Sequence, residues 1–239
     1  MYFLVRHIYS SSILEVKLLK IAFVQGFDSE KINFGWLLHA FALTMVSVVG
    51  TGIAAMSKNL SLANSAAFLS LIVLSMGTFL FLVKLFTLFK KHFSDRSLPD
   101  KEFLPSFLIV IPIITLIAIS FFRLGHYLES ALGVHLTGYF YLVIGLSFAF
   151  EIWYMIFGFS LLKDYFKKNH FNEYYPTQWG LICPLVAFGV LAGFAHKVVL
   201  STNVIYLLSP IFLVLAIFLF VEIFRKHCSC KKGKNKVSC

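Results

Sequence analysis

Long apolar runs alternate with short polar segments along the chain, and the polar segments carry most of the charged residues. A membrane-spanning helix needs roughly 20 mostly apolar residues. Six runs reach this length, and each is predicted to form a transmembrane helix: 33–56, 66–89, 104–122, 136–162, 180–199 and 203–224. The apolar stretch 13–24 is shorter and contains charged residues, so it is interpreted as an interfacial amphipathic helix or a degraded span.

The composition agrees with a protein that lies in a membrane. Of the 239 residues, 59% are hydrophobic and only 13% are charged, whereas about a quarter of the residues of a typical soluble domain are charged. We therefore predict an all-α, polytopic membrane bundle of about six helices arranged as three hairpins. The net charge of +10 does not indicate a nucleic-acid partner, because the basic residues lie between the apolar runs.

The distribution of Lys and Arg predicts the orientation, because cytoplasmic loops are enriched in these residues. If both termini are cytoplasmic, only Lys58, Arg123 and Lys197 of the 21 Lys and Arg lie outside. The predicted location is the inner (plasma) membrane. The chain then consists of an N-terminal cytoplasmic or interfacial segment, a transmembrane domain and a basic cytoplasmic tail, at 1–31, 32–224 and 225–239.

Glycine and proline are concentrated in the first helix of each predicted hairpin. The first span contains Gly50 and Gly52, and the third contains Pro112. The fifth contains Pro184, while the sixth breaks the pattern with Pro210. Broken helices are tolerated in membranes where neighbouring helices or a water-filled path satisfy the freed carbonyl groups. The alternation favours an inner ring of kinked helices and an outer ring of straighter ones, although glycine also serves close helix packing.

Three stretches resemble a known family of membrane proteins. They are "INFGWLLHAFALTMVSVVGTGIAA", "RSLPDKEFLPSFLIVIPI" and "TQWGLICPLVAFG", at 32–55, 96–113 and 177–189. In this order they resemble the last three hairpins of the tellurite-resistance/C4-dicarboxylate transporter family, which includes the slow anion channels of plant guard cells. The resemblance implies kinked odd-numbered helices around a central pore, and a homotrimer with one pore per subunit. It also implies that the family's first four helices are missing, or reduced to the segment before Asp28.

The resemblance further identifies a gate position. In the family a phenylalanine of the ninth helix plugs the pore, and alignment on Trp179 and Pro184 places Cys183 at that position. A smaller side chain implies a looser or ungated constriction, unless Phe188 supplies the aromatic ring. The pore and gate candidates are Cys183, Pro184, Phe188, Pro112, Gly50, Gly52 and His39.

Several ionisable residues lie within or beside the predicted spans. Glu151 lies near the middle of the fourth span, where a carboxylate costs on the order of 2.5–3.5 kcal/mol. It would carry a proton coupled to anion movement, or it is a packed, hydrogen-bonded carboxyl group. His39 would titrate near neutral pH, or it is a packed interfacial residue. Arg123 and Lys197 would attract anions to a pore mouth, or they are ordinary helix anchors.

The sequence contains no recognised catalytic set, which predicts that the protein is not an enzyme. The C-x-C spacing of Cys228 and Cys230 with the distal Cys239 matches no strong zinc pattern, so no metal or other cofactor is predicted. Paired haem ligands would require histidines at matched depth, and only His39 lies well inside a span.

The predicted function is transport of small anions (inorganic anions, oxyanions or dicarboxylates) through a central helix-lined pore. Small anions and membrane lipids are the expected partners. An alternative remains open, in which the chain is a truncated, non-conducting family member that acts as a membrane interaction subunit. A membrane redox protein using the histidines or Cys183 is a third possibility.

Overall fold

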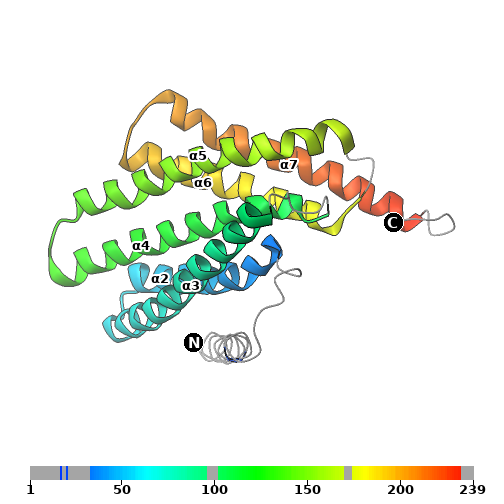
Figure 1. Cartoon of the computed structure of the whole chain (residues 1–239). Helices are drawn as coiled ribbons and strands as arrows, with labels where there is room; N and C mark the ends of the chain where they lie inside the picture. The colour runs from blue at the N-terminus through cyan, green and yellow to red at the C-terminus, as the bar shows by residue number, and fades with distance from the viewer. Residues whose placement is uncertain (1–16, 18–19, 21–32, 96–101, 170–173, 233–239) are drawn as a thin grey trace. The chain divides into compact units, whose positions relative to one another are not determined.

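The computed structural model describes residues 17, 20, 33–95, 102–169 and 174–232, and the structural statements below concern these residues. Their secondary structure is helical, and six of the helices are long and apolar enough to cross a membrane. The predicted all-α, polytopic membrane fold is therefore confirmed (Figure 1). The helix expected over 13–24 lies outside the described residues, apart from residues 17 and 20.

The first helix of each hairpin begins with a short 3-10 segment. The 3-10 segments and the helices that follow them are η2 (Phe34–Leu37) with α2 (Leu38–Met56), η3 (Leu104–Ile109) with α4 (Val110–Leu132), and η4 (Pro176–Leu181) with α6 (Ile182–Val198). The second helices are continuous α-helices: α3 (Leu60–Asp95), α5 (Thr137–Asn169) and α7 (Asn203–Lys232). The sequence predicted that the first and second helices of each hairpin would differ in regularity. They do differ, because only the first helices begin with a 3-10 segment.

The local sequence explains these starts. The Asn33 side chain accepts a hydrogen bond from the Gly35 backbone N–H at 3.0 Å and caps η2. In η3 and η4 a proline occupies one of the first two positions, where its missing N–H costs nothing because that group has no intrahelical partner.

Pro112 and Pro184 do not break their helices in the way that the sequence indicated. Each is the third residue of an α-helix, α4 and α6 respectively. A first-turn N–H makes no bond within the helix, so proline is tolerated there. The irregularity lies in the 3-10 segment that precedes each proline.

The described chain forms two compact units, with the boundary inside α4. The first unit contains η2, α2, α3 and the second half of α4, and α2 packs along α3 within it (Figure 1). The second unit contains η3, the first half of α4, α5, η4, α6 and α7. In this unit α6 packs against α5 and α7, and η3 packs against η4.

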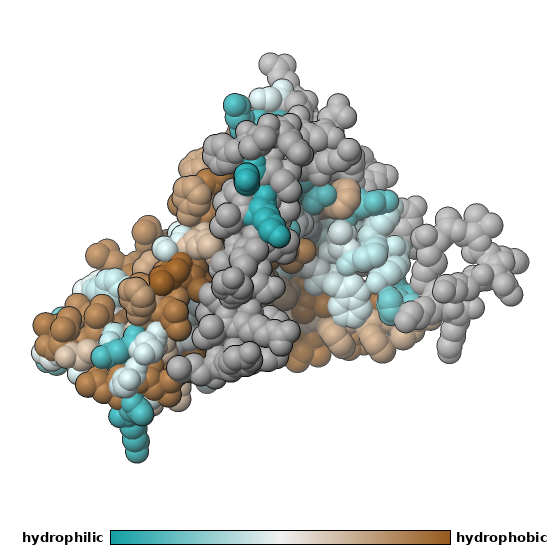
Figure 2. Space-filling view, turned by 90° about the horizontal axis from the view of Figure 1, so that it is seen from below, coloured by the Kyte–Doolittle hydropathy of each residue, from teal (hydrophilic) through white to brown (hydrophobic). Residues whose placement is uncertain are grey.

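The two kinds of helix differ in burial. Within the most apolar 18 residues of each span, 44% are buried in the span containing α2, 67% in that containing α4 and 44% in that containing α6. The corresponding values for α3, α5 and α7 are 39, 33 and 6%. Large apolar side chains such as Phe68, Leu146 and Val204 are exposed on the second helices. Figure 2 shows hydrophobic residues, in brown, over much of the part of this face that is not grey. These surfaces suit contact with lipid chains, as expected for a membrane protein.

α6 lies close to α7 at Gly189. A Cβ atom there would lie 3.1 Å from the Ser209 backbone oxygen and 3.5 Å from Leu213 Cγ. We expect Gly189→Leu to push the helices apart and to destabilise the protein by about 1–3 kcal/mol, as overpacking does. The measurement is the melting temperature in detergent. The matched control is Gly138→Leu, because a Cβ at Gly138 meets nothing within 4 Å, and equal melting temperatures for the two variants would contradict this packing.

Candidate functional site

Glu151 of α5 is fully buried in the second unit. Its Oε1 accepts a hydrogen bond of 2.5 Å from the Thr115 hydroxyl group on the first half of α4. Its Oε2 has no hydrogen-bond partner among the described residues. Oε1 is therefore fixed by a hydrogen bond. A proton could bind to Oε2 without displacing any hydrogen bond that the carboxyl group already makes.

A stacked aromatic pair lies beside this acid. Tyr154, one turn further along α5, is also buried, and its hydroxyl donates to the Phe107 carbonyl oxygen at 3.0 Å. The rings of Tyr154 and Phe107 stack with centroids 5.0 Å apart. This contact attaches α5 to η3 and fixes the helix that presents Glu151.

Cys183, the predicted gate position, is exposed on α6. Val186 and Val190 are exposed at the following turns of the same helix, so the three residues lie on one face at helical spacing. Pro184 and Leu185 are buried on the opposite side. A larger side chain at Cys183 would project from the unit and would not disturb its core.

Phe188 lies in the core of the second unit. It is 4% exposed, and its ring centroid lies 5.5 Å from that of Phe148 and 4.5 Å from that of Phe212. The side chain thus packs α6 against α5 and α7, and these contacts favour a packing role over that of a substitute gate.

Three further pore candidates, His39, Gly50 and Gly52, lie on α2 in the first unit, whereas Pro112 lies on the first half of α4 in the second unit. His39 is half-buried, with Nδ1 3.4 Å from the Trp36 carbonyl oxygen. The α-helix continues through Gly50 and Gly52 without interruption. A Cβ at Gly50 would overlap the Ser70 side chain of α3, and one at Gly52 would lie 2.9 Å from Arg123 Nη1. The glycines therefore provide room for neighbouring side chains.

Arg123 makes a contact that the sequence did not reveal. Its Nη1 donates to the Val48 carbonyl oxygen of α2 at 2.8 Å. Ser120 lies one turn before Arg123 on α4, and its hydroxyl oxygen accepts a hydrogen bond of 3.3 Å from Ser47, the residue before Val48 on α2. The guanidinium group thus lies against the middle of α2, and this position was not predictable from the outer end of an apolar run.

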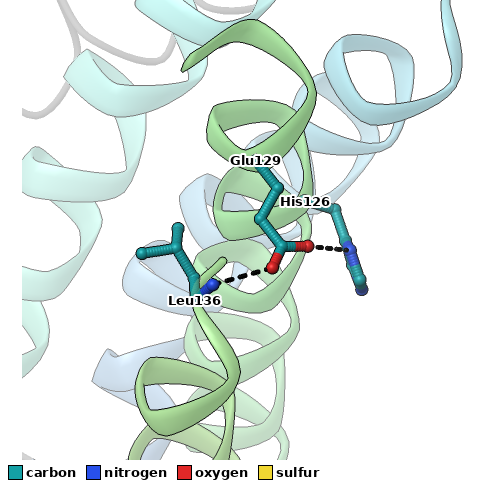
Figure 3. Close-up of polar contacts among 3 residues, drawn as sticks. All are labelled: His126, Glu129 and Leu136. Carbon is teal, nitrogen blue, oxygen red and sulfur yellow. Dashed lines mark hydrogen bonds and ion pairs between the residues drawn. The ribbon is translucent and has the colours of Figure 1, made fainter. Parts of the chain in front are cut away.

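Glu129, the carboxylate that follows Arg123 on α4, contacts two other groups (Figure 3). Glu129 Oε1 accepts from the Leu136 backbone N–H at 2.8 Å, and Oε2 lies 3.3 Å from His126 Nδ1. This arrangement stabilises the turn between α4 and α5. No group of three His, Cys, Asp or Glu side chains in the described ranges could hold a metal ion.

The membrane-facing helices and the family comparison together classify the chain. Six apolar helices in three hairpins define a multi-pass helical membrane protein. The model of the voltage-dependent anion channel (SLAC1) family matches residues 3–228, so the chain belongs to that family. Comparison with curated proteins and with solved structures gives no match. The family predicted from the three sequence stretches is confirmed, and the match extends beyond 32–224 at both ends.

Proposed function

We propose that this protein is a channel or transporter for small anions and not an enzyme. Membership of the voltage-dependent anion channel family over residues 3–228 carries the proposal. The substrates are inorganic anions, oxyanions or dicarboxylates, and the protein works in the inner (plasma) membrane with both termini in the cytoplasm.

The difference between first and second helices supports this function. The first helices start with a 3-10 segment and are more buried, whereas the second helices are continuous and expose apolar side chains. By resemblance, the first helices line the anion path and the second helices face lipid. In the apolar parts of such a path, selectivity comes from its width and from weak electrostatics.

Purified protein in liposomes is expected to pass nitrate and chloride faster than empty liposomes do. The reason is that the first helices would enclose a path that replaces the hydrocarbon barrier. The measurement is anion flux under imposed potentials and at several pH values. Absence of flux from folded protein under all these conditions would exclude the channel and would favour the alternative, a non-conducting interaction subunit.

The oligomeric state belongs to the same proposal. By family resemblance the protein is a homotrimer, in which each subunit has its own pore. The native mass of the detergent-solubilised complex, determined on the sample used for flux, tests this assembly.

A further inference from the structure

We propose that Arg123 binds a small inorganic oxyanion, such as nitrate, where the second half of α4 meets the middle of α2. The proposal rests on the proposed function, because it assigns a binding residue to the same anion path. The Arg123 guanidinium and the Ser120 hydroxyl group supply the hydrogen-bond donors. Gly52 provides the space in which the guanidinium lies.

The charge of Arg123 is not balanced by an acid. Its hydrogen bond goes to the neutral Val48 carbonyl group, and no carboxylate of the described residues forms an ion pair with it. The nearest acid along α4 is Glu129, which is held by His126 and the Leu136 backbone. A guanidinium group has five N–H donors, so most of them are left for a ligand.

The direction of the side chain argues against an interfacial anchor. An anchoring arginine extends its head group towards water. Helical side chains instead point back towards the N-terminus of their helix, and Arg123 follows this rule by contacting Val48, two turns before α2 ends at Met56. The charge thus lies deeper than the outer end of either helix, where an unpaired cation is costly.

The surroundings of this cation are polar. Ser47 and Thr51 of α2 are fully buried, as is Ser120 of α4, and Ser70 of α3 is nearly so. The Ser47 hydroxyl proton has two acceptors within reach, the Ser120 hydroxyl oxygen at 3.3 Å and the Ser70 carbonyl oxygen at 3.4 Å. When Ser47 donates to Ser120, the Ser120 hydroxyl proton is left for another acceptor. Ser120 lies one turn before Arg123 on α4, so the two side chains share a face. These buried hydroxyl groups make the interior around this part of α2 polar.

Gly52 determines how close the guanidinium comes to α2. A Cβ atom at this position would lie 2.9 Å from Arg123 Nη1 and 3.6 Å from Cζ. These atoms form the far end of a flexible side chain, so Gly52→Ala moves the guanidinium without overlapping any backbone. The planar fork of the guanidinium matches two oxygens of one oxyanion, which favours nitrate over a spherical halide.

The experiment measures nitrate binding and nitrate flux separately on the full-length protein. Binding is read from the rise in melting temperature with nitrate at constant ionic strength, balanced with gluconate, because a ligand of the folded state stabilises it. We expect Arg123→Gln to remove this rise and Arg123→Lys to retain part of it. We expect Gly52→Ala to raise the half-saturating nitrate concentration several-fold. Lys58→Gln removes an equal charge from an exposed position to which no role is assigned, and should behave as wild type.

The possible results separate the proposed Arg123 oxyanion site from the proposed anion transport, so that either can fail alone. An unchanged nitrate response in Arg123→Gln overturns the site, even if the protein conducts. If that variant does not fold, an unchanged response in both Arg123→Lys and Gly52→Ala overturns it. A nitrate response that depends on Arg123 in protein without flux supports the site and removes the proposed function. An equal loss in Lys58→Gln indicates surface charge only and also overturns the site.

Discussion

Replacement of Cys183 by phenylalanine is expected to reduce anion flux through the reconstituted protein by about tenfold. A tenfold change corresponds to roughly 1.4 kcal/mol added to the barrier. By the resemblance of residues 177–189, Cys183 takes the position of the family's aromatic gate, and it is exposed on α6, so an added ring would extend into the proposed path. The buried contacts of Phe188 on the same helix would remain intact. Flux in liposomes is the measurement.

Two variants separate the size of the side chain from its chemistry and its place. Cys183→Ala removes the thiol without adding bulk and should conduct at least as well as wild type. Cys228→Phe makes the same substitution at an exposed cysteine near the end of α7 and should leave flux unchanged. If Cys183→Phe conducts like wild type at an unchanged melting temperature, Cys183 does not line the path.

Substitution of Glu151 by glutamine is expected to abolish anion accumulation driven by a pH gradient while leaving potential-driven flux in place. Glutamine keeps an oxygen that accepts the Thr115 hydroxyl hydrogen bond, so the fold should be retained. It cannot carry a proton, and the unpartnered Oε2 of Glu151 is the position that would. The measurement is anion uptake into liposomes with an imposed pH gradient.

Thr115→Val supplies the control for this experiment, because it removes the hydrogen bond and keeps the acid. It should retain uptake driven by the pH gradient, with a loss of about 1 kcal/mol in stability. Equal uptake by wild type and Glu151→Gln would mean that Glu151 is a packed carboxyl group without a transport role.

The positions of the six spans were predictable because a helix that crosses the hydrocarbon layer needs about 20 mostly apolar residues, and such runs are visible in the sequence. The ends of the helices were less predictable. A helix can continue beyond the apolar run into polar residues that lie outside the hydrocarbon layer, and hydropathy does not mark where it stops. The third span was predicted over 104–122, but α4 runs to Leu132. Its end is marked by Gly133, whose φ of 68° suits the residue that follows a helix. This glycine signal was present in the sequence and lies outside the apolar run.

The 3-10 starts were not predictable from glycine and proline content alone. Pro112 and Pro184 indicated an irregularity near the start of two helices, but sequence alone did not indicate on which side of each proline it lies. The structure places it upstream, over Leu104–Ile109 and Pro176–Leu181.

The inward contacts of site residues depend on pairings between distant parts of the chain. Arg123 and the Val48 carbonyl group are 75 residues apart, and nothing local to either predicts the pairing. Phe188 is a gate candidate because it is an aromatic residue that could replace the ring missing at Cys183. Its burial was not predictable, because a membrane helix is apolar on all sides and periodicity does not separate its core face from its lipid face. Glu151 was identified because a single acid interrupts an apolar run.

The length of the second helices has a consequence for how anions are collected. α3 contains 36 residues, which corresponds to about 54 Å, whereas the hydrocarbon layer is about 30 Å thick. Tilting accommodates only part of this excess. On the proposed orientation, the C-terminal ends of α3, α5 and α7 therefore overhang into the cytoplasm and carry Lys90, Lys163 and Arg225. In the proposed anion channel, these projecting ends would create a positive potential that enriches anions before they reach the membrane.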